Sequence, residues 1–263
     1  MLASSDDEVV RWTVACNPLT PVESLTFLAS DADIEVRCAV ADHGKSPVGV
    51  HERLARDVDP LVRGSVAANV RCRRETLAWL AEDPDVGVRL EAAGNRSTPL
   101  HALLELEEEG GHQILEKLFG NGAFPDERIE KYALAEDAEV RLLAASSGRL
   151  DWHMLQYLAA DEDARVRLAV AADPATPIEA LAQLLEEGSI RFGELIGFPG
   201  PFDAPAADDW LSFTESDAIQ VAVARNPSTP TELLERWLEC DDEEETELQK
   251  AIRARLSAAE EQS

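Results

Sequence analysis

The sequence predicts an all-α solenoid of about nine two-helix repeats in 263 residues. The first observation behind this prediction is a fixed period. An aliphatic marker residue recurs every 26 residues through seven copies and then twice more out of phase. The markers are Val10, Val36, Val62, Val88, Ile114, Val140, Val166, Ile190 and Ile219. A fixed period of this length is typical of a solenoid, in which each unit buries its apolar face only against its neighbours.

The second observation is the spacing of apolar residues inside each repeat. Residues four and five places after the marker are apolar, as in the set Val62, Val66 and Ala67. This spacing places the residues on one face of a helix, whereas the residues of a half-buried strand would alternate. We therefore predict that each marker lies in the first helix of its repeat.

The ends of this first helix are predicted by residues that cap helices. Asp83-Pro84-Asp85 is a typical start. An Asp can cap the helix, Pro is tolerated at the first helical position, and a second acid lies near the positive end of the helix dipole. Seven places after the marker the usual residue is Asn, as at Asn69. Asn and Gly tolerate the left-handed backbone that ends many helices, so we expect the first helix to end there.

A second short helix follows in each repeat. Thr20-Pro21 shows its start, because a hydroxyl can cap a helix and Pro is favoured at its first position. Leu25 and Leu28 then form its core-facing side. Each helix has roughly ten residues, too few to be stable alone in water, so the helices depend on stacking.

The repeat follows the pattern D-x-D-x-x-V-R-x-x-V-A-x-N-P-x-T-P-x-x-x-L-x-x-L-A. This pattern resembles the leucine-rich repeat variant family and is similar to HEAT-like repeats, from the start of the chain to Cys240. The resemblance implies a right-handed superhelix in which one helix of each pair is 3₁₀ and not α. A founding member of that family has an iron–sulfur cluster in a cysteine-rich N-terminal segment. Here the repeats begin by Asp6 without such a segment, so we expect no cofactor.

The repeat pattern also predicts the domain organisation. We expect a single repeat solenoid over residues 1–240, with irregular repeats at 111–135 and 188–215. Gly and Pro in these two stretches disfavour a regular second helix. Residues 241–263 begin with an acidic run and continue with apolar residues at helical spacing, which predicts a C-terminal capping helix.

An Arg follows the marker in most repeats. These residues are Arg11, Arg37, Arg63, Arg89, Arg141 and Arg167. One interpretation is a ladder that binds anions. The favoured interpretation is structural, with each Arg pairing with acids of its own or the next repeat, because guanidinium groups suit partly buried carboxylates. The similarity to HEAT-like repeats implies that the Asp and the Arg six residues apart form the pair, as in Asp57 and Arg63.

The charge of the chain disfavours some partners. With 24 Lys and Arg against 52 Asp and Glu, the formal net charge is −28. A polyanionic surface repels phosphate backbones, so we expect no general nucleic-acid binding, whereas a basic protein partner would be attracted. No signal peptide and no apolar run of membrane-spanning length is present, which favours a cytoplasmic protein without membrane contact. The cysteines lie far apart, so we expect no metal site and buried, reduced thiols at Cys16, Cys38, Cys72 and Cys240.

Aromatic residues gather in the two irregular stretches. Phe119 and Phe124 lie in the first, and Phe198, Phe202 and Trp210 lie in the second. Irregular insertions on a rigid scaffold are frequent binding surfaces, so these five residues form the candidate partner-binding site. The alternative is that the rings are buried and repair a defective repeat.

Motifs of catalysis are weak in this sequence. There is no H-E-x-x-H and no G-x-S-x-G, and His43-Gly44-Lys45-Ser46 lacks the earlier Gly that a phosphate-binding loop needs. We therefore expect no catalytic residues and interpret the chain as a non-enzymatic repeat scaffold that mediates protein–protein interaction. Two alternatives stay open. The family resemblance implies an accessory or chaperone-like factor for a metallo- or pigment-protein. The similarity to HEAT-like repeats allows an enzyme of the DNA-glycosylase type.

Overall fold

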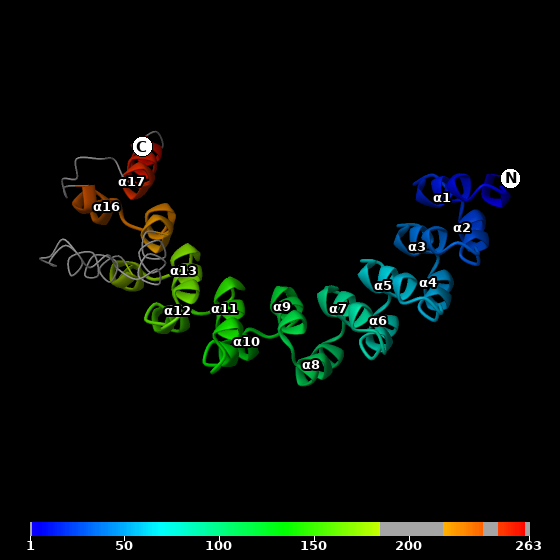
Figure 1. Ribbon diagram of the computed structural model, residues 1–263, viewed down its shortest axis with the longest axis horizontal. Helices are drawn as coiled ribbons and strands as arrows, with labels where there is room; N and C mark the ends of the chain where they lie inside the picture. The colour runs from blue at the N-terminus through cyan, green and yellow to red at the C-terminus, as the bar shows by residue number, and fades with distance from the viewer. Residues whose placement is uncertain (1, 185–217, 239–246, 261–263) are drawn as a thin grey trace, which may run out of the picture. The chain divides into compact units, whose positions relative to one another are not determined.

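The computed structural model describes residues 2–184, 218–238 and 247–260 of the chain (Figure 1). These residues form α-helices, a short 3₁₀ helix and connecting turns, with no strand among them. The helices pack in series, as a solenoid requires, so the predicted all-α fold class is confirmed. The chain divides into two compact units, Met1–Pro125 and Asp126–Ser263.

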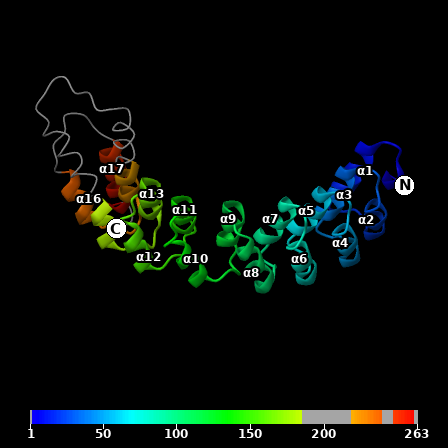
Figure 2. The ribbon, with the colours of Figure 1, turned by 60° about the horizontal axis from the view of Figure 1, so that its bottom comes forward.

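The first unit consists of two layers of helices. The first-helix layer contains α1 (Glu8–Cys16), α3 (Ile34–Asp42), α5 (Pro60–Ala68), α7 (Val86–Gly94) and α9 (His112–Gly120). The second-helix layer contains α2 (Val22–Leu28), α4 (Val48–Leu54), α6 (Arg74–Leu80) and α8 (Leu100–Glu109). Each first helix packs against the neighbouring first helices, and each second helix packs against the two first helices that flank it (Figure 2). A 3₁₀ turn, η1 (Leu2–Ser4), packs against α1 and α2.

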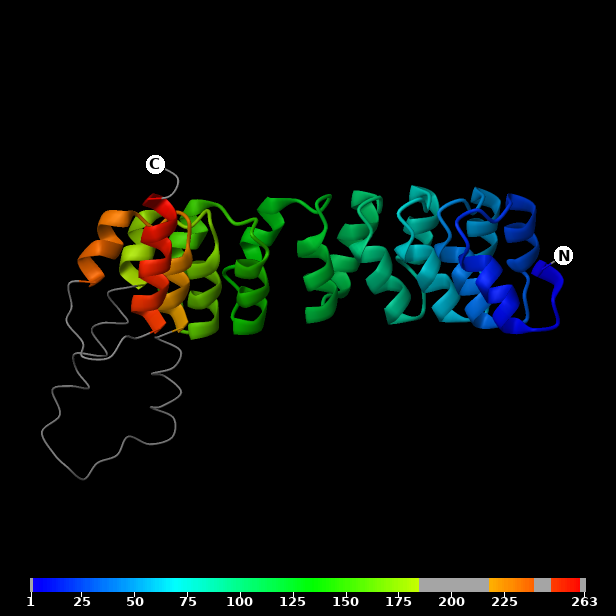
Figure 3. The same ribbon diagram turned by 90° about the horizontal axis from the view of Figure 1, so that it is seen from above.

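The second unit repeats the same pairing. It begins with α10 (Asp126–Tyr132), α11 (Ala138–Ser146), α12 (Trp152–Leu158) and α13 (Ala164–Ala172), followed by helical residues 178–184. Its later part contains helical residues 218–225, α16 (Thr231–Leu238) and α17 (Glu247–Glu260). The terminal helix α17, coloured red in Figure 3, packs against α16. Ala251 and Ile252 of α17 are buried together with Ala224 and Leu234. The acidic run at residues 241–245 lies outside the described residues.

Both helices of the described pairs are α-helices. The first helices make α-type hydrogen bonds from their first turn, as between the Arg37 amide and the Asp33 carbonyl at 3.3 Å. The second helices do the same, as between the Leu25 amide and the Pro21 carbonyl at 3.1 Å. The 3₁₀ helix that the family resemblance implies for one member of each pair is therefore wrong for the described repeats. Each helix is long enough, at seven to ten residues up to α13, to complete α turns.

The first helices are capped by the second Asp of the Asp-x-Asp pattern. Asp85 accepts hydrogen bonds from the amides of Gly87 at 2.9 Å and Val88 at 3.3 Å. The same cap is formed by Asp7, Asp33, Asp59, Asp137 and Asp163. The expectation that the first Asp is the cap is wrong, because Asp83 lies two residues further from the helix and binds Arg63 of the preceding repeat.

The hydroxyl of the Thr-Pro pair ends the first helix and does not start the second. Thr98 Oγ1 donates to the Ala92 carbonyl at 2.6 Å. The same bond is made by Thr20, Ser46, Thr176 and Thr229. The predicted hydroxyl cap of the second helix is therefore wrong, since its N-cap is Pro, as at Pro99, and no side chain caps it. The hydroxyl satisfies one of the carbonyls that a helix end leaves without an intrahelical partner.

In most repeats the marker and the residues four and five places later are buried in the core. The markers Val36, Val62 and Val166 are fully buried. Val66 and Ala67, four and five places after Val62, are also fully buried. The residue five places after the marker is usually Ala, and its small side chain allows neighbouring first helices to approach closely. The core therefore follows the 26-residue period.

We predict that Val88→Asp destabilises the protein by about 3 kcal/mol, because Val88 is 1% exposed and the charge would be buried without a partner. Val86→Asp is the matched control on the same helix. Val86 is 49% exposed at the helix start, where an acid is favourable, so its effect should stay within about 0.5 kcal/mol. Urea unfolding followed by circular dichroism measures both. Equal stability of the two variants would contradict the packing described above.

Candidate functional site

Each Arg of the ladder that has a described partner binds an acid of the following turn of the solenoid. The Arg37 guanidinium donates to both carboxylate oxygens of Asp57, from Nε at 2.7 Å and from Nη2 at 3.0 Å. Its Nη1 donates to the Asp31 carbonyl at 2.8 Å. Such a forked contact fixes both the distance and the angle between two repeats. In every described pair the acid lies 20 residues after the Arg in the sequence. The pairs are Arg11–Asp31, Arg37–Asp57, Arg63–Asp83, Arg89–Glu109 and Arg141–Asp161.

The pairing differs from the one that the similarity to HEAT-like repeats implies. The Asp six residues before each Arg supplies its main-chain carbonyl, as Asp57 does to Arg63 Nη1 at 2.9 Å. Its carboxylate is already bound by the Arg of the preceding repeat, Arg37. Arg167 makes the same contact with the residue six places earlier, because its Nη1 donates to the Asp161 carbonyl at 2.7 Å. The position 20 residues after Arg167 lies outside the described residues.

The ion pairs shift the pKa values of their carboxyl groups. Burial alone would raise the pKa of Asp57, yet hydrogen bonds from Arg37 and from a backbone amide outweigh burial and lower that pKa below its ordinary value. The same balance lowers the pKa values of Asp31 and Asp83. The pKa of Arg63 is raised, chiefly by its hydrogen bond to Asp83. The folded state therefore favours the charged form of both partners.

A second ladder runs through the Asn residues at the ends of the first helices. Asn95 Nδ2 donates to the carbonyls of Ala67 at 2.7 Å and Asn69 at 3.0 Å, both in the preceding repeat. Its Oδ1 accepts from the Ser97 amide at 3.0 Å, which closes the turn after the helix. The side chains of Asn69 and Asn121 at the same position also bind the preceding repeat, and that of Asn226 donates to the Ala171 and Asp173 carbonyls, 55 and 53 residues back.

The sequence interpretation missed this second ladder. The expected left-handed backbone is wrong: Asn95 has φ −76° and ψ 120°, and in the described part of the chain only Gly residues have a positive φ. Asn is suited to the position because an amide offers a donor to the preceding repeat and an acceptor to its own turn. A signal was present, since left-handed positions favour Gly and only Gly197 is Gly among the nine equivalent positions.

His43 and Asp173, two of the residues that replace Asn at this position, differ in the hydrogen bonds that they make. His43 reproduces both bonds, because its Nδ1 accepts from the Lys45 amide at 3.0 Å and its Nε2 lies 3.0 Å from the Asn17 carbonyl. Asp173 reproduces only the turn, with Oδ1 accepting from the Ala175 amide at 2.8 Å. Its Oδ2 is buried without a hydrogen-bond partner. A carboxyl group lacks the amide N–H that the Asn side chain donates at this position, so this rung of the ladder is defective.

The predicted aromatic site is not exposed where the structure describes it. Phe119 and Phe124 are 2% and 1% exposed, and their ring centroids lie 6.3 Å apart. This corrects the expectation that these two residues offer a contact patch, because the rings fill the interior of the irregular repeat. Phe198, Phe202 and Trp210 lie outside the described residues.

The first-helix layer of the first unit contains a hollow of about 600 Å³ at α1 and α3, which we call the Trp12 hollow. Its uncharged lining from these two helices consists of Trp12, Ala15, Cys16, Cys38 and Ala39. Its charged lining consists of Glu35, Asp42, Lys45 and Arg71. The Trp12 side chain is 45% exposed, so part of its ring faces solvent. No pattern in the sequence predicts this hollow, because its lining residues come from three repeats.

The thiols of this region are free and weakly acidic. Cys16 is exposed, so the expectation that it is buried is wrong, whereas Cys72 is buried and Cys38 is half-buried. Burial raises the pKa values of the Cys16 and Cys38 thiols, and it raises the pKa of Cys72 to about 11. A thiol with a raised pKa is protonated at neutral pH and is a poor nucleophile. Burial also raises the pKa of the Asp42 carboxyl in the Trp12 hollow.

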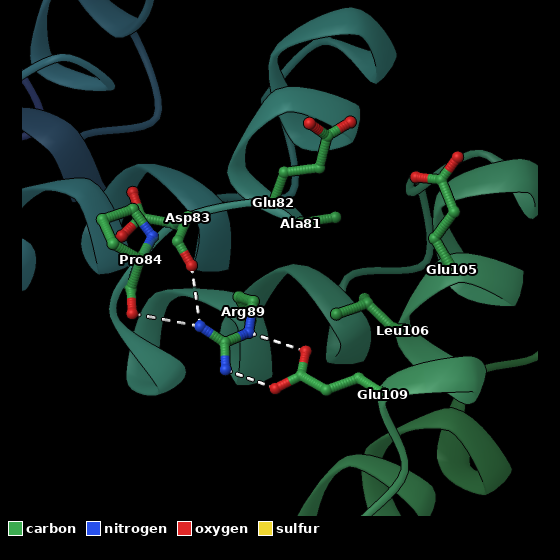
Figure 4. A pocket seen from close by; sticks show the side chains of 8 residues that line it. All are labelled: Ala81, Glu82, Asp83, Pro84, Arg89, Glu105, Leu106 and Glu109. Atoms are coloured by element: carbon green, nitrogen blue, oxygen red, sulfur yellow. Dashed lines mark hydrogen bonds and ion pairs between the residues drawn. The ribbon is translucent and has the colours of Figure 1, made fainter.

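A second hollow, of about 380 Å³, lies beside the Arg89–Glu109 ion pair (Figure 4). Arg89 Nε donates to Glu109 at 2.8 Å, and Nη1 donates to the Asp83 carbonyl at 2.7 Å. The acids that line the hollow are Glu82, Asp83, Glu105 and Glu109. The guanidinium is thus occupied by the ladder, and the hollow is acidic.

Neither a metal-binding cluster nor a membrane-spanning helix is present among residues 2–184, 218–238 and 247–260. No group of three or more His, Cys, Asp or Glu side chains in these ranges is arranged to hold a metal ion. Within the same ranges, no helix combines the length and the apolar character needed to cross a bilayer. The stretch His43-Gly44-Lys45-Ser46 forms the turn between α3 and α4 and not a loop after a strand.

Comparisons with known proteins do not identify a family. No protein-family model matches the chain, and no curated protein matches it. Among solved structures, the chain is similar to a crystal structure of an engineered protein at 17% sequence identity. The similarity covers 99% of this chain and 94% of that chain, with a TM-score of 0.17, which is too low to support an argument about fold or function.

We predict that the stabilising effect of the Arg ladder is lost in acid. A carboxyl whose pKa is lowered by folding stabilises the protein above its unfolded pKa of about 3.9, and this contribution is lost as the pH falls through the folded pKa. Arg63→Gln leaves Asp83 buried without its cation, so the variant should be less stable than the wild type at neutral pH. The difference should narrow as the pH approaches about 3.

Urea unfolding at a series of pH values measures this difference. Arg74→Gln is the control, because Arg74 is exposed and outside the ladder. Its difference from the wild type should stay small at every pH. A destabilisation by Arg63→Gln that does not change with pH would contradict the assignment of the effect to the Asp83 carboxylate.

We predict opposite effects from exchanging amide and carboxylate in the Asn ladder. Asn95→Asp removes the donor to two buried carbonyls and should destabilise the protein by about 2 kcal/mol. Asp173→Asn supplies the missing donor at the defective rung and should stabilise the protein by about 1 kcal/mol. Thermal unfolding of both variants at pH 7 checks the signs, and a loss of stability in Asp173→Asn would refute the account of that rung.

Proposed function

We propose that this chain is a non-enzymatic repeat scaffold that binds another protein through the first-helix layer of its first unit. The observation that supports this proposal most is the Trp12 hollow, in which an exposed Trp ring borders Ala39 and two protonated thiols. Pockets of this kind accept an apolar side chain of a partner, and charged groups at the edge orient the bound segment. Protonated thiols suit an apolar lining better than a catalytic role.

The two ladders support the proposal because they hold the binding surface rigid. The Arg11–Asp31 ion pair and the contact of His43 Nε2 with the Asn17 carbonyl connect the first two repeats, so the relative placement of Trp12 on α1 and Cys38 on α3 is fixed. A preorganised surface loses little conformational entropy when a partner binds, which leaves more of the contact energy as affinity.

The net charge of −28 supports a partner that is basic overall, because opposite charge accelerates encounter between proteins. The free thiols support action in a reducing compartment, and we propose the cytoplasm. The repeat pattern supports placing the chain with the leucine-rich repeat variant and HEAT-like repeat proteins, and we propose that relationship on the pattern alone.

We predict that Trp12→Ala weakens capture of the protein partner at least about tenfold while leaving the helical circular dichroism spectrum unchanged. The measurement is affinity capture from the native host's lysate at moderate and at high salt, read by quantitative mass spectrometry. Trp152→Ala is the matched control, because this Trp is 57% exposed but lies in the second unit.

Equal loss in both variants would overturn the hollow as the anchor of the complex. Retention of nucleic acid or a metal by the wild type, with no protein at a fixed ratio, would overturn the scaffold itself and favour an enzyme of nucleic acid or a metal-protein factor.

A further inference from the structure

We propose that the second-helix layer of the first unit is a separate docking surface for an acidic protein segment that contains apolar side chains. The surface lies on α2, α4 and α6 and does not include any residue that lines the Trp12 hollow. We call it the arginine–aromatic ridge and define it as Phe27, Arg53, Arg56, Arg73, Arg74 and Trp79. The proposal goes beyond the binding function above, because it assigns a second partner of opposite charge.

Charge is the first reason for this assignment. The chain as a whole has more than twice as many acids as bases, yet residues 51–79 contain six Arg and four acids. Two of these acids are occupied inside the fold, since Asp57 binds Arg37 of the ladder and Asp59 caps α5. Of the six Arg, Arg63 is likewise occupied by the ladder and Arg71 lines the Trp12 hollow, which leaves four Arg on the ridge. The exposed charge of this stretch is therefore positive, in a protein that is otherwise strongly acidic.

The geometry of the ridge is the second reason. Phe27, Arg53 and Trp79 each lie 17 residues after their marker, so they occupy the same place on three consecutive second helices. Arg53 Nη2 donates to the Thr26 carbonyl at 3.2 Å, which connects α4 to the helix that bears Phe27. The Arg56 guanidinium lies 6.0 Å from the centre of the Trp79 ring, which connects the end of α4 to α6.

Exposure is the third reason. Phe27 is 59% exposed and Trp79 is 48% exposed, although both are large apolar side chains. Trp and Arg are the residues most enriched among those that dominate the energy of protein interfaces. At the next second helix, α8, the equivalent position is Glu105, so the positive and aromatic character ends there. The ridge thus has a defined length of three helices.

The distribution of acids on the ridge favours a protein segment over a nucleic acid. Arg73 Nη1 lies 3.7 Å from Glu52 Oε1, and Glu75 follows Arg74 in the sequence. A phosphodiester backbone has a charge at every nucleotide and would place phosphates against these carboxylates. An acidic peptide can instead place carboxylates against Arg53 and Arg56 and apolar side chains against the two rings.

The test uses the full chain and fluorescence anisotropy with three labelled probes of equal length. The first is a peptide in which Glu alternates with Leu and Phe, the second has Lys in place of each Glu, and the third is an oligothymidine. The variants are Arg53→Glu with Arg56→Glu, and Trp79→Ala. The matched control is Arg96→Glu with Lys117→Glu, which changes the net charge equally at two exposed cations of the same unit outside the ridge.

The Lys peptide can bind the acidic surface outside the ridge, so its affinity should not fall in the ridge variants. We expect the acidic peptide to bind the wild type more tightly than the oligothymidine, with an affinity that falls as salt is added. The double Glu variant on the ridge should weaken it at least about tenfold, Trp79→Ala several-fold, and the control double variant less than about twofold. Trp12→Ala should leave this affinity unchanged, which separates the ridge from the proposed function of the hollow. Circular dichroism verifies that each variant is folded.

Three results would overturn the proposal. Equal weakening by the ridge and control variants would mean that net charge alone governs binding. Tighter binding of the oligothymidine than of the acidic peptide would make the ridge a surface for single-stranded nucleic acid. No binding of the acidic peptide by the folded wild type would mean that the ridge is not a docking surface for acidic segments.

Discussion

Hydrogen bonds that cross from one repeat to the next are the interaction on which the rest of the structure depends. A helix of seven or nine residues is not stable alone, so its position is determined by its neighbours. Apolar packing holds the repeats together but does not by itself fix their register. The Arg ladder fixes it through a forked contact 20 residues on, and the Asn ladder fixes it through carbonyls 26 and 28 residues back. Because the two ladders act on opposite ends of the first helices, each helix is held against both translation and rotation.

The repeat, the helix pairs and the core could be predicted from the sequence because they depend on local spacing. Apolar residues such as Val62 and Val66 fall on one helix face whatever surrounds them. The roles of polar residues could not be predicted in the same way, because they depend on which groups lie nearby in space. Thr98 was expected to cap the following helix and instead caps the preceding one. Asn95 was expected to end the helix in a left-handed conformation and instead binds another repeat. In both cases the residue type admits several partners, and only the three-dimensional arrangement selects one.

For the predicted aromatic site, the repeat register indicates the observed burial, although the irregular sequence suggested a binding surface. Phe119 lies five places after its marker, at a core position that most other repeats fill with Ala, and Phe124 lies where five other repeats have Thr or Ser. The register of the repeat therefore predicts that both rings are buried. This prediction was missed because the sequence around them is irregular. The Trp12 hollow and the arginine–aromatic ridge could not be read in this way, since each is assembled from side chains of three repeats. Their lining residues become neighbours only when the repeats stack.

The Arg ladder is interrupted at the irregular repeat of Ile114, and this interruption shows how the stack tolerates an irregular repeat. Leu115 occupies the Arg position after Ile114, and the position 20 residues on is Ala135, so both members of the ion pair are replaced by apolar residues. Replacing only one would leave a partly buried charge without its partner, which costs more than losing the pair. The division of the chain after Pro125 falls between these two residues. In contrast, Asn121 keeps its bonds to Ala93 and Asn95, so the Asn ladder continues through the same repeat. A repeat can therefore lose one ladder and remain bound to its predecessor through the other, which explains why Phe119 and Phe124 are accommodated without loss of the helical register.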